Sequence, residues 1–300
     1  MYGKILVPLD GSPTAESVLS IARAIAGGLK VPVELLSVID LVELARNVSA
    51  AENLFLDTLA EDETRSRREY LAKIAESFSG GEVHGLVEKG KAESVILETA
   101  AAEKDTLIAM ATHGRSGLNR WLLGSVAEKV LRATSNPLLL VRASAASSRA
   151  RRPLKSIVVP LDGSPLAETV LPGVVDLAKK LDLQVMLFRA FNIPYGVYDG
   201  GGAYGVDLER LVAAVEAEAQ RYLEEKRAEL QAAGLEKVAI ASKQGMGADE
   251  IISFTRKSPD TLIAMCSHGR SGVKRWVLGS VTETVVRHAD TPVLIFRAAG

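Results

Sequence analysis

The chain carries one sequence twice, and this duplication limits its fold more than any other feature. Residues 5–19 read ILVPLDGSPTAESVL, and residues 157–171 read IVVPLDGSPLAETVL. Residues 105–142 recur without a gap as residues 260–297. The offsets between the copies, 152 and 155 residues, are far longer than a solenoid period and close to the length of an ordinary domain. The sequence therefore predicts one domain duplicated in tandem.

A short segment between the copies has the composition of a linker. Residues 144–153 consist of alanine, serine, arginine and a final proline, so the segment has no apolar face to bury. We expect a first domain at residues 1–143, a linker at 144–153 and a second domain at 154–300.

Within each copy, strand-like apolar runs alternate with helix-like spacing. In the first copy we expect helices at residues 15–27, 64–77, 92–104 and 126–134, the first of them ending at Gly27–Gly28. We expect strands at residues 4–9, 31–38, 82–89, 106–111 and 138–141. Helices that connect parallel strands give an α/β fold, so we predict two tandem doubly wound sheets of five parallel strands each.

The last strand of each copy would lie at an open edge of its sheet. These strands are expected at residues 138–141 and 293–296. Pairing between them would remove two exposed edges, so we expect the copies to pack as an intramolecular pseudo-dimer. Whether two tandem chains assemble further into a homodimer is left open.

The loop after the fourth strand holds the strongest functional pattern. Gly114 is followed by nine residues and then by Gly124–Ser125 at a helix start, and the second copy repeats this spacing with Gly269 and Gly279–Ser280. Glycines let backbone N–H groups approach an anion, and a helix start offers unpaired N–H donors. The pattern predicts a phosphate site, although it is neither a Walker A loop nor a dinucleotide fingerprint. In doubly wound sheets, ligands bind beyond the carboxyl ends of the strands, where this loop lies.

These residues resemble the ATP-binding branch of the universal stress protein family. That branch carries Gly-x2-Gly-x9-Gly-Ser/Thr at this loop and an aspartate directly after the first strand, where this chain has Asp10 and Asp162. The resemblance covers both copies, and the order, the spacing and the strand context agree twice. The first glycine of the motif is replaced by Ala111 and Cys266, and the bulkier cysteine makes the second copy less suited to adenosine.

The resemblance also implies which residues would hold an adenine nucleotide. Asp10 and the backbone of Val38 would bind the base. Met110 and Ala111 would line the ribose. The phosphates would be held by Gly114, Gly124, Ser125 and Val126. Ala190 is matched to Val38 by position, although the residues around it differ. The corresponding positions of the second copy are Asp162, Ala190, Met265, Cys266, Gly269, Gly279, Ser280 and Val281.

Simpler structural roles stay open for several of these residues. Asp10 suits a cap for the turn that follows it, and Gly124–Ser125 suits an ordinary helix start. Cys266 lies in an apolar run and suits a small core residue. Trp121 and Trp276 stand among leucine and valine, so we expect them to pack in a core or between subunits rather than on a base.

The overall composition limits the classes of partner. Lysine plus arginine (36) balances aspartate plus glutamate (37), which gives no large field for nucleic acid or an anionic membrane. No apolar run approaches the roughly 20 residues that span a bilayer. The single cysteine fits a reducing compartment. We therefore expect a cytoplasmic protein without a nucleic-acid or membrane partner.

The sequence predicts a stress-response protein that binds ATP and acts as a nucleotide-dependent switch for a protein partner. Asp10 and Asp162 could hold Mg²⁺ through the nucleotide. No paired carboxylates, Ser-His-Asp order or metal-ligand spacing indicates a catalytic site. The alternatives are a slow ATP hydrolase of the same fold and an interaction protein that binds no nucleotide. The charged stretch 43–70 is expected to form a solvated helix, with a cover over the site as the alternative.

Overall fold

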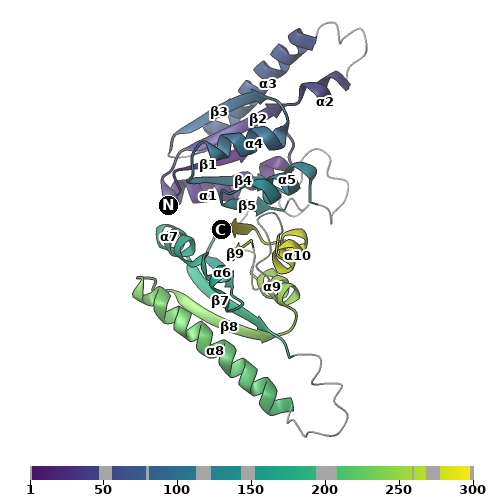
Figure 1. Ribbon diagram of the computed structural model, residues 1–300. Coiled ribbons are helices and arrows are strands. Elements are labelled where there is room, and N and C mark those ends of the chain that lie inside the picture. Colours follow the sequence, from purple (N-terminus) through teal and green to yellow (C-terminus); the bar gives the residue numbers. More distant parts are fainter. Residues whose placement is uncertain are drawn as a thin grey trace. The chain divides into compact units, whose positions relative to one another are not determined.

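The computed structural model divides into two compact units, residues 1–153 and residues 154–300, and each is described by itself (Figure 1). The residues that the structure describes are 2–46, 56–78, 81–112, 123–142, 153–193, 208–258, 260–267 and 278–297. The expected pseudo-dimer concerns the placement of one unit against the other and stays a prediction.

The first unit contains a sheet of five parallel strands. They run in the order β3-β2-β1-β4-β5, so the strand order reverses between β1 and β4. The strands are β1 (Lys4–Pro8), β2 (Val33–Ile39), β3 (Val83–Lys89), β4 (Thr106–Ala111) and β5 (Leu138–Val141). The helices are a short 3-10 helix η1 (Ala15–Val18), α1 (Leu19–Leu29), α2 (Leu41–Arg46), α3 (Leu56–Glu76), α4 (Ala92–Ala101) and α5 (Ser125–Ala133).

The second unit repeats this plan, with its five parallel strands in the order β8-β7-β6-β9-β10. Its strands are β6 (Ser156–Pro160), β7 (Gln184–Phe191), β8 (Val238–Gln244), β9 (Thr261–Cys266) and β10 (Val293–Phe296). Its helices are α6 (Pro165–Glu168), α7 (Leu171–Leu181), α8 (Leu208–Ala232), α9 (Gly247–Arg256) and α10 (Ser280–His288). The predicted fold class, two tandem doubly wound α/β sheets, is confirmed.

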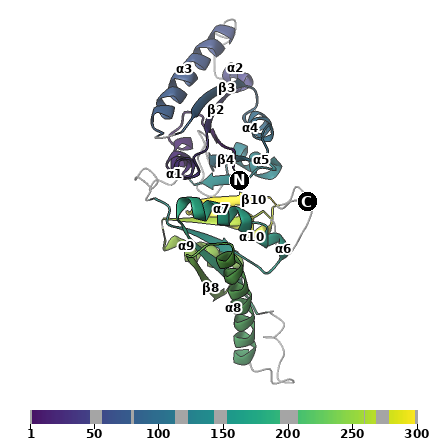
Figure 2. The ribbon, with the colours of Figure 1, turned by 90° about the vertical axis from the view of Figure 1, so that its left-hand side faces the viewer.

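The burial of the strands explains why their sequences are so apolar. Every residue of β4 and β9 is buried, as are Ile5, Leu6 and Val7 in β1. Strands covered on both faces read as continuous apolar runs. The edge strand β3 has no buried residue, and the long helix α3 runs along β2 and β3. Figure 2 shows α8 lying along β8 in the same way.

The strand registers align the two units residue by residue. Ile5 pairs with Val33 in the first unit, and Ile157 pairs with Val185 in the second, so the offset of 152 residues holds through β2 and β7. The offset becomes 155 at β3 and β8, which begin at residues 83 and 238. The offset is still 152 at Tyr70 and Tyr222 within the long helices, and α8 has 25 residues where α3 has 21, so the extra residues of the second unit lengthen the end of its long helix.

The predicted end of the first helix is wrong. Helix α1 continues through both glycines to Leu29, and Lys30 takes the left-handed conformation with φ of 54°. Leu29 is buried one turn after Ile25, so the apolar face of the helix needs that last residue. Asp182 has φ of 52° after α7, which shows that the second unit ends its helix in the same way.

Candidate functional site

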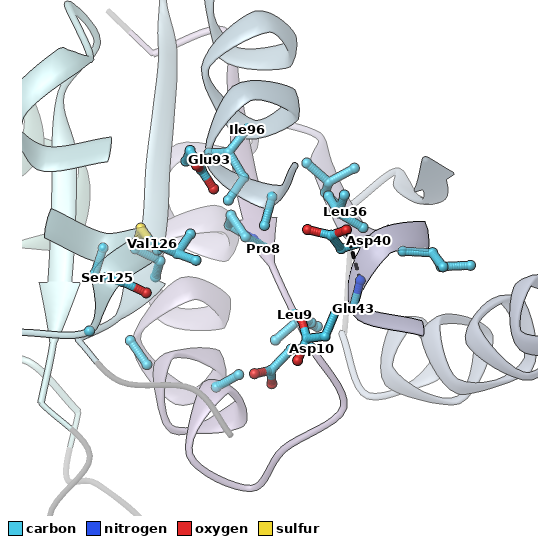
Figure 3. Close-up of a pocket in the computed structure, with 18 of the residues that line it drawn as sticks. Pro8, Leu9, Asp10, Leu36, Asp40, Glu43, Glu93, Ile96, Ser125 and Val126 are labelled. Carbon is cyan, nitrogen blue, oxygen red and sulfur yellow. Dashed lines mark hydrogen bonds between the residues drawn. The ribbon is translucent and has the colours of Figure 1, made fainter. Parts of the chain in front are cut away.

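A cavity of about 470 Å³ lies at the carboxyl ends of β1, β2 and β4 in the first unit (Figure 3). Its size falls within the roughly 300–1,000 Å³ of small-molecule sites. It also lies at the point where the strand order reverses, which is where ligands bind in sheets of this kind. Of the eight residues expected in this site, Gly114 lies outside the described residues. The other seven all line the cavity: Asp10, Val38, Met110, Ala111, Gly124, Ser125 and Val126.

Asp10 organises the turn that leaves β1. Its Oδ1 atom accepts hydrogen bonds from the backbone N–H of Ser12 at 2.9 Å and from the Ser12 hydroxyl at 2.6 Å. The Ser12 hydroxyl oxygen in turn accepts from the backbone N–H of Ala15 at 3.1 Å, at the start of η1. The turn-capping role is therefore present in the structure, and the same carboxylate also lines the cavity.

The second unit builds the same turn with Asp162. Its Oδ1 accepts from the N–H and the hydroxyl of Ser164 at 2.9 and 2.6 Å. Ser164 then caps α6 by accepting from the N–H of Ala167 at 3.2 Å. The duplicated sequence thus gives duplicated geometry at this position.

The start of α5 is fixed beside the end of β4. The N–H of Gly124 donates to the carbonyl of Thr112 at 2.7 Å, and the equivalent N–H of Gly279 donates to the carbonyl of Ser267 at 2.9 Å. Among the described residues, no side chain caps either helix. Ser125 and Val126, which open α5, line the cavity. A helix N-terminus with uncapped N–H donors favours an anion at this end of the cavity.

The cavity also contains charged residues that the sequence argument did not identify. Their carboxylates are those of Asp40, Glu43, Glu63 and Glu93, and the guanidinium is that of Arg67. Asp40 follows β2 directly, so the strand-end rule could have found it. Its Oδ1 caps α2 by accepting from the N–H group of Val42 at 2.9 Å. It also accepts from the N–H group of Glu43 at 3.2 Å (Figure 3).

Helix α3 is more than the solvated helix expected for this charged stretch. It begins at Leu56, eight residues before the predicted start, and it buries Ala60, Arg67 and Leu71. Arg67 donates from Nε to Oε1 of Glu63 at 2.7 Å and from Nη1 to the hydroxyl of Ser37 at 3.4 Å. One face of α3 therefore packs on β2 and contributes to the cavity.

Two further contacts set the ionisation of groups around the cavity. Lys129 lies 2.6 Å from Glu93, and its hydrogen bond is the main cause that lowers the pKa of the Glu93 carboxyl. The Tyr70 hydroxyl donates to Oε1 of Glu16 at 3.0 Å. Burial, followed by this hydrogen bond, raises the pKa of Tyr70 well above its usual value. Tyr70 therefore stays a donor that ties α3 to η1.

The sites expected in the second unit occupy equivalent places. Ala190 lies on β7 where Val38 lies on β2. Met265 and Cys266 end β9, while Gly279, Ser280 and Val281 open α10; Gly269 lies outside the described residues. Cys266 is buried, and its Sγ accepts from the Thr169 hydroxyl at 3.5 Å. The thiol thus occupies space where the family motif has a glycine.

Within the described ranges, no cluster of three or more histidine, cysteine, aspartate or glutamate side chains has the arrangement of a metal site. No helix in the same ranges is long and apolar enough to cross a membrane.

Comparisons with known proteins match both copies. A universal stress protein of Mycolicibacterium smegmatis is 26% identical over 302 residues, which cover 99% of this chain and 97% of that protein. Universal stress protein MJ0577 of Methanocaldococcus jannaschii is 32% identical over 157 residues, which cover 47% of this chain and 96% of that protein. The crystal structure of a universal stress protein from Archaeoglobus fulgidus covers 100% of both chains with a TM-score of 0.70 at 20% identity, which supports the fold.

The sequence model of the universal stress protein family matches residues 1–142 and again residues 153–297. These two matches account for both sheets and for both copies of the loop between the fourth strand and its helix. The chain therefore belongs to the universal stress protein family, with two family domains in tandem.

Proposed function

We propose that the first unit binds ATP or a closely related adenine nucleotide in the cavity at the end of its sheet. The observation that carries this proposal is that one cavity joins Asp10, the end of β2 at Val38 and the start of α5. Strand β1 separates β2 from β4. The two sides of the cavity are therefore about 10 Å apart, at roughly 4.8 Å between neighbouring strands. That span suits a nucleotide with its base at β2 and its phosphates at α5.

The polar groups at the two ends suit these two parts of a nucleotide. At the start of α5, Gly124 has no side chain to keep an oxyanion from the backbone, and the hydroxyl of Ser125 adds a donor. At the ends of β1 and β2, Asp10 and Asp40 offer carboxylate oxygens to amino and hydroxyl groups. Mg²⁺ would enter with the nucleotide, because this ion is usually held by one or two carboxylates together with substrate phosphates.

Binding would act as a switch through the segments that border the cavity. Helix α2, which follows β2, contributes Glu43 and Leu44 to the cavity while Val42 points to solvent with 59% of its surface exposed. A nucleotide that contacts Glu43 or Leu44 would change how α2 presents Val42. We propose that a protein partner detects this change during a stress response.

Substitution of Gly124 tests the phosphate end of the site. Gly124→Asp places a side chain and a negative charge at the start of α5, so we expect the affinity for ATP to fall at least about tenfold in isothermal titration calorimetry. Gly27→Asp is the matched control, because a Cβ at that exposed position of α1 has no atom within 4 Å. Equal affinities of the Gly124→Asp variant and the parent would refute the assigned phosphate site.

A further inference from the structure

The two units carry an arginine at the same place, but on different elements. The strand registers make Arg189 of β7 equivalent to Ser37 of β2. The long helices align through their tyrosines, since Tyr70 bonds to Glu16 and Tyr222 bonds to Glu168 in the same way. This alignment makes Ala219 of α8 equivalent to Arg67 of α3. Each unit thus pairs one arginine with one small residue across the contact between its second strand and its long helix.

The surroundings of the two arginines are alike. Arg67 and Arg189 are each 8% exposed. Each has a glutamate from the long helix as ion-pair partner, Glu63 at 2.7 Å for Arg67 and Glu218 at 3.3 Å for Arg189. The Arg189 guanidinium also lies 5.0 Å from the centre of the Tyr222 ring. Both units therefore have a guanidinium at the contact between the second strand and the long helix. The helix supplies it in the first unit, and the strand supplies it in the second.

We propose, resting on the nucleotide site proposed above, that Arg67 is a specificity-determining residue whose guanidinium donates a hydrogen bond to a ring nitrogen of the purine. Arg189 is its counterpart in the second unit. The nucleotide then meets a cation at its base as well as donors at its phosphates.

The position of Arg67 in the cavity favours the base over the phosphates. Arg67 lies on α3 and bonds to Ser37 of β2, so it belongs to the β2 side rather than the α5 side. Its two hydrogen bonds to described residues use two of the five N–H donors of a guanidinium. Among the described residues, no hydrogen-bond partner occupies the other three N–H groups, and Arg67 lines the cavity in which a ligand would lie.

The charges of the cavity lining also favour the base as the group that Arg67 binds. Among the described residues that line it, Arg67 is the one cation, beside the carboxylates of Asp10, Asp40, Glu43, Glu63 and Glu93. Carboxylates accept hydrogen bonds and cannot donate them when ionised, so among these charged side chains the arginine is the donor for an acceptor on the base. The ring nitrogens of adenine are such acceptors, whereas its amino group is a donor that suits a carboxylate.

The test compares ATP with its 1-deaza, 3-deaza and 7-deaza analogues, each of which lacks one ring nitrogen. Full-length protein in a Gly279→Asp background limits binding to the first unit. We expect one of these analogues to bind about tenfold more weakly than ATP, as for loss of one hydrogen bond to a charged group. In Arg67→Ala, ATP should bind about tenfold more weakly and be no longer distinguished from that analogue.

The second unit supplies a matched rescue variant. The triple variant S37R/S66E/R67A reproduces in the first unit the arrangement of Arg189, Glu218 and Ala219. It should restore the discrimination that Arg67→Ala loses. Arg67→Met keeps more of the apolar stem, so it should lose the discrimination while retaining the melting temperature better than Arg67→Ala.

A purely structural arginine gives a different result. Arg67→Ala and Arg67→Met would then weaken ATP and all three analogues by one common factor, or by none, and this outcome overturns the proposal. If the Gly279→Asp parent binds no ATP at all, the proposed function fails and this inference fails with it. Tight ATP binding without discrimination among the analogues overturns the role of Arg67 alone.

Discussion

The two tyrosine contacts allow a stability prediction in which each unit is the control for the other. The Tyr70 hydroxyl lies 3.0 Å from Oε1 of Glu16, and the Tyr222 hydroxyl lies 2.9 Å from Oε1 of Glu168. Glu168 has a second partner, Lys226, at 2.9 Å. The position equivalent to Lys226 in the first unit is Ile74, which cannot form this ion pair. Removal of the hydroxyl should therefore be more costly in the first unit.

The expected losses in free energy of unfolding depend on which partner each carboxylate retains after the tyrosine hydroxyl is removed. Tyr70→Phe leaves Glu16 without its hydrogen bond in a partly buried place, so we expect the free energy of unfolding to fall by about 1.5–2 kcal/mol. Tyr222→Phe leaves Glu168 with its lysine, so we expect a loss of about 0.5–1 kcal/mol. The chain has one tryptophan in each copy, Trp121 and Trp276. Urea unfolding followed by fluorescence in Trp276→Phe and Trp121→Phe backgrounds then reports one unit at a time.

The pH dependence gives a second check on Tyr70. Burial raises the pKa of Tyr70 above its usual value of 10.0, so the fold favours the neutral hydroxyl. The stabilisation is fully present below pH 10 and is lost as the pH rises further, because the unfolded chain then ionises first. The difference in free energy of unfolding between wild type and Tyr70→Phe should therefore decrease above pH 10. Equal losses for the two tyrosine variants at neutral pH would refute the reasoning about Lys226.

Three further predictions concern two glycines of the first unit and one ion pair beside the cavity. Gly90 has φ of 148°, which an L side chain rarely adopts, so Gly90→Ala should destabilise the first unit by about 1–3 kcal/mol in urea unfolding. Gly27→Ala in α1, where a Cβ meets nothing, should instead stabilise it by about 0.5–1 kcal/mol. Lys129→Met removes the ion pair that lowers the pKa of Glu93, so we expect a loss of at most about 1 kcal/mol at pH 7. That loss should disappear as the pH falls below the usual pKa of a glutamate, because a lowered pKa stabilises only while the carboxylate is ionised; a loss independent of pH would contradict this.

The strands could be predicted from the sequence because buried parallel strands consist of consecutive apolar residues. Strands β4 and β5 begin and end at the predicted residues 106–111 and 138–141. The helix ends were harder, since Lys30 rather than a glycine takes the left-handed conformation after α1. The apolar burial of Leu29 outweighed the local preference of glycine for a helix end.

The residues at the strand end and the helix start of the site could be predicted, whereas the charged residues that α3 contributes to its lining could not. Glycine spacing pointed to Gly124, and the family resemblance pointed to Asp10 directly after the first strand, because both patterns are local in the sequence. Arg67 lies 30 residues from Ser37, its strand partner, and charged residues on a long helix are normally solvated. The second unit carries its arginine on the strand, as Arg189, instead of on the long helix. In the sequence this difference appears only as poor similarity between the copies around Val38 and Ala190, and the strand registers are needed to interpret it.

Gentle denaturation of freshly purified protein, followed by mass spectrometry of the released small molecules, tests the central claim most directly. We predict an adenine nucleotide at about one equivalent per chain from the first unit, and less of it from the Gly124→Asp variant. About two equivalents would show that Cys266 does not prevent binding in the second unit. Absence of any nucleotide, together with no heat of binding on titration with ATP and Mg²⁺, would contradict the claim.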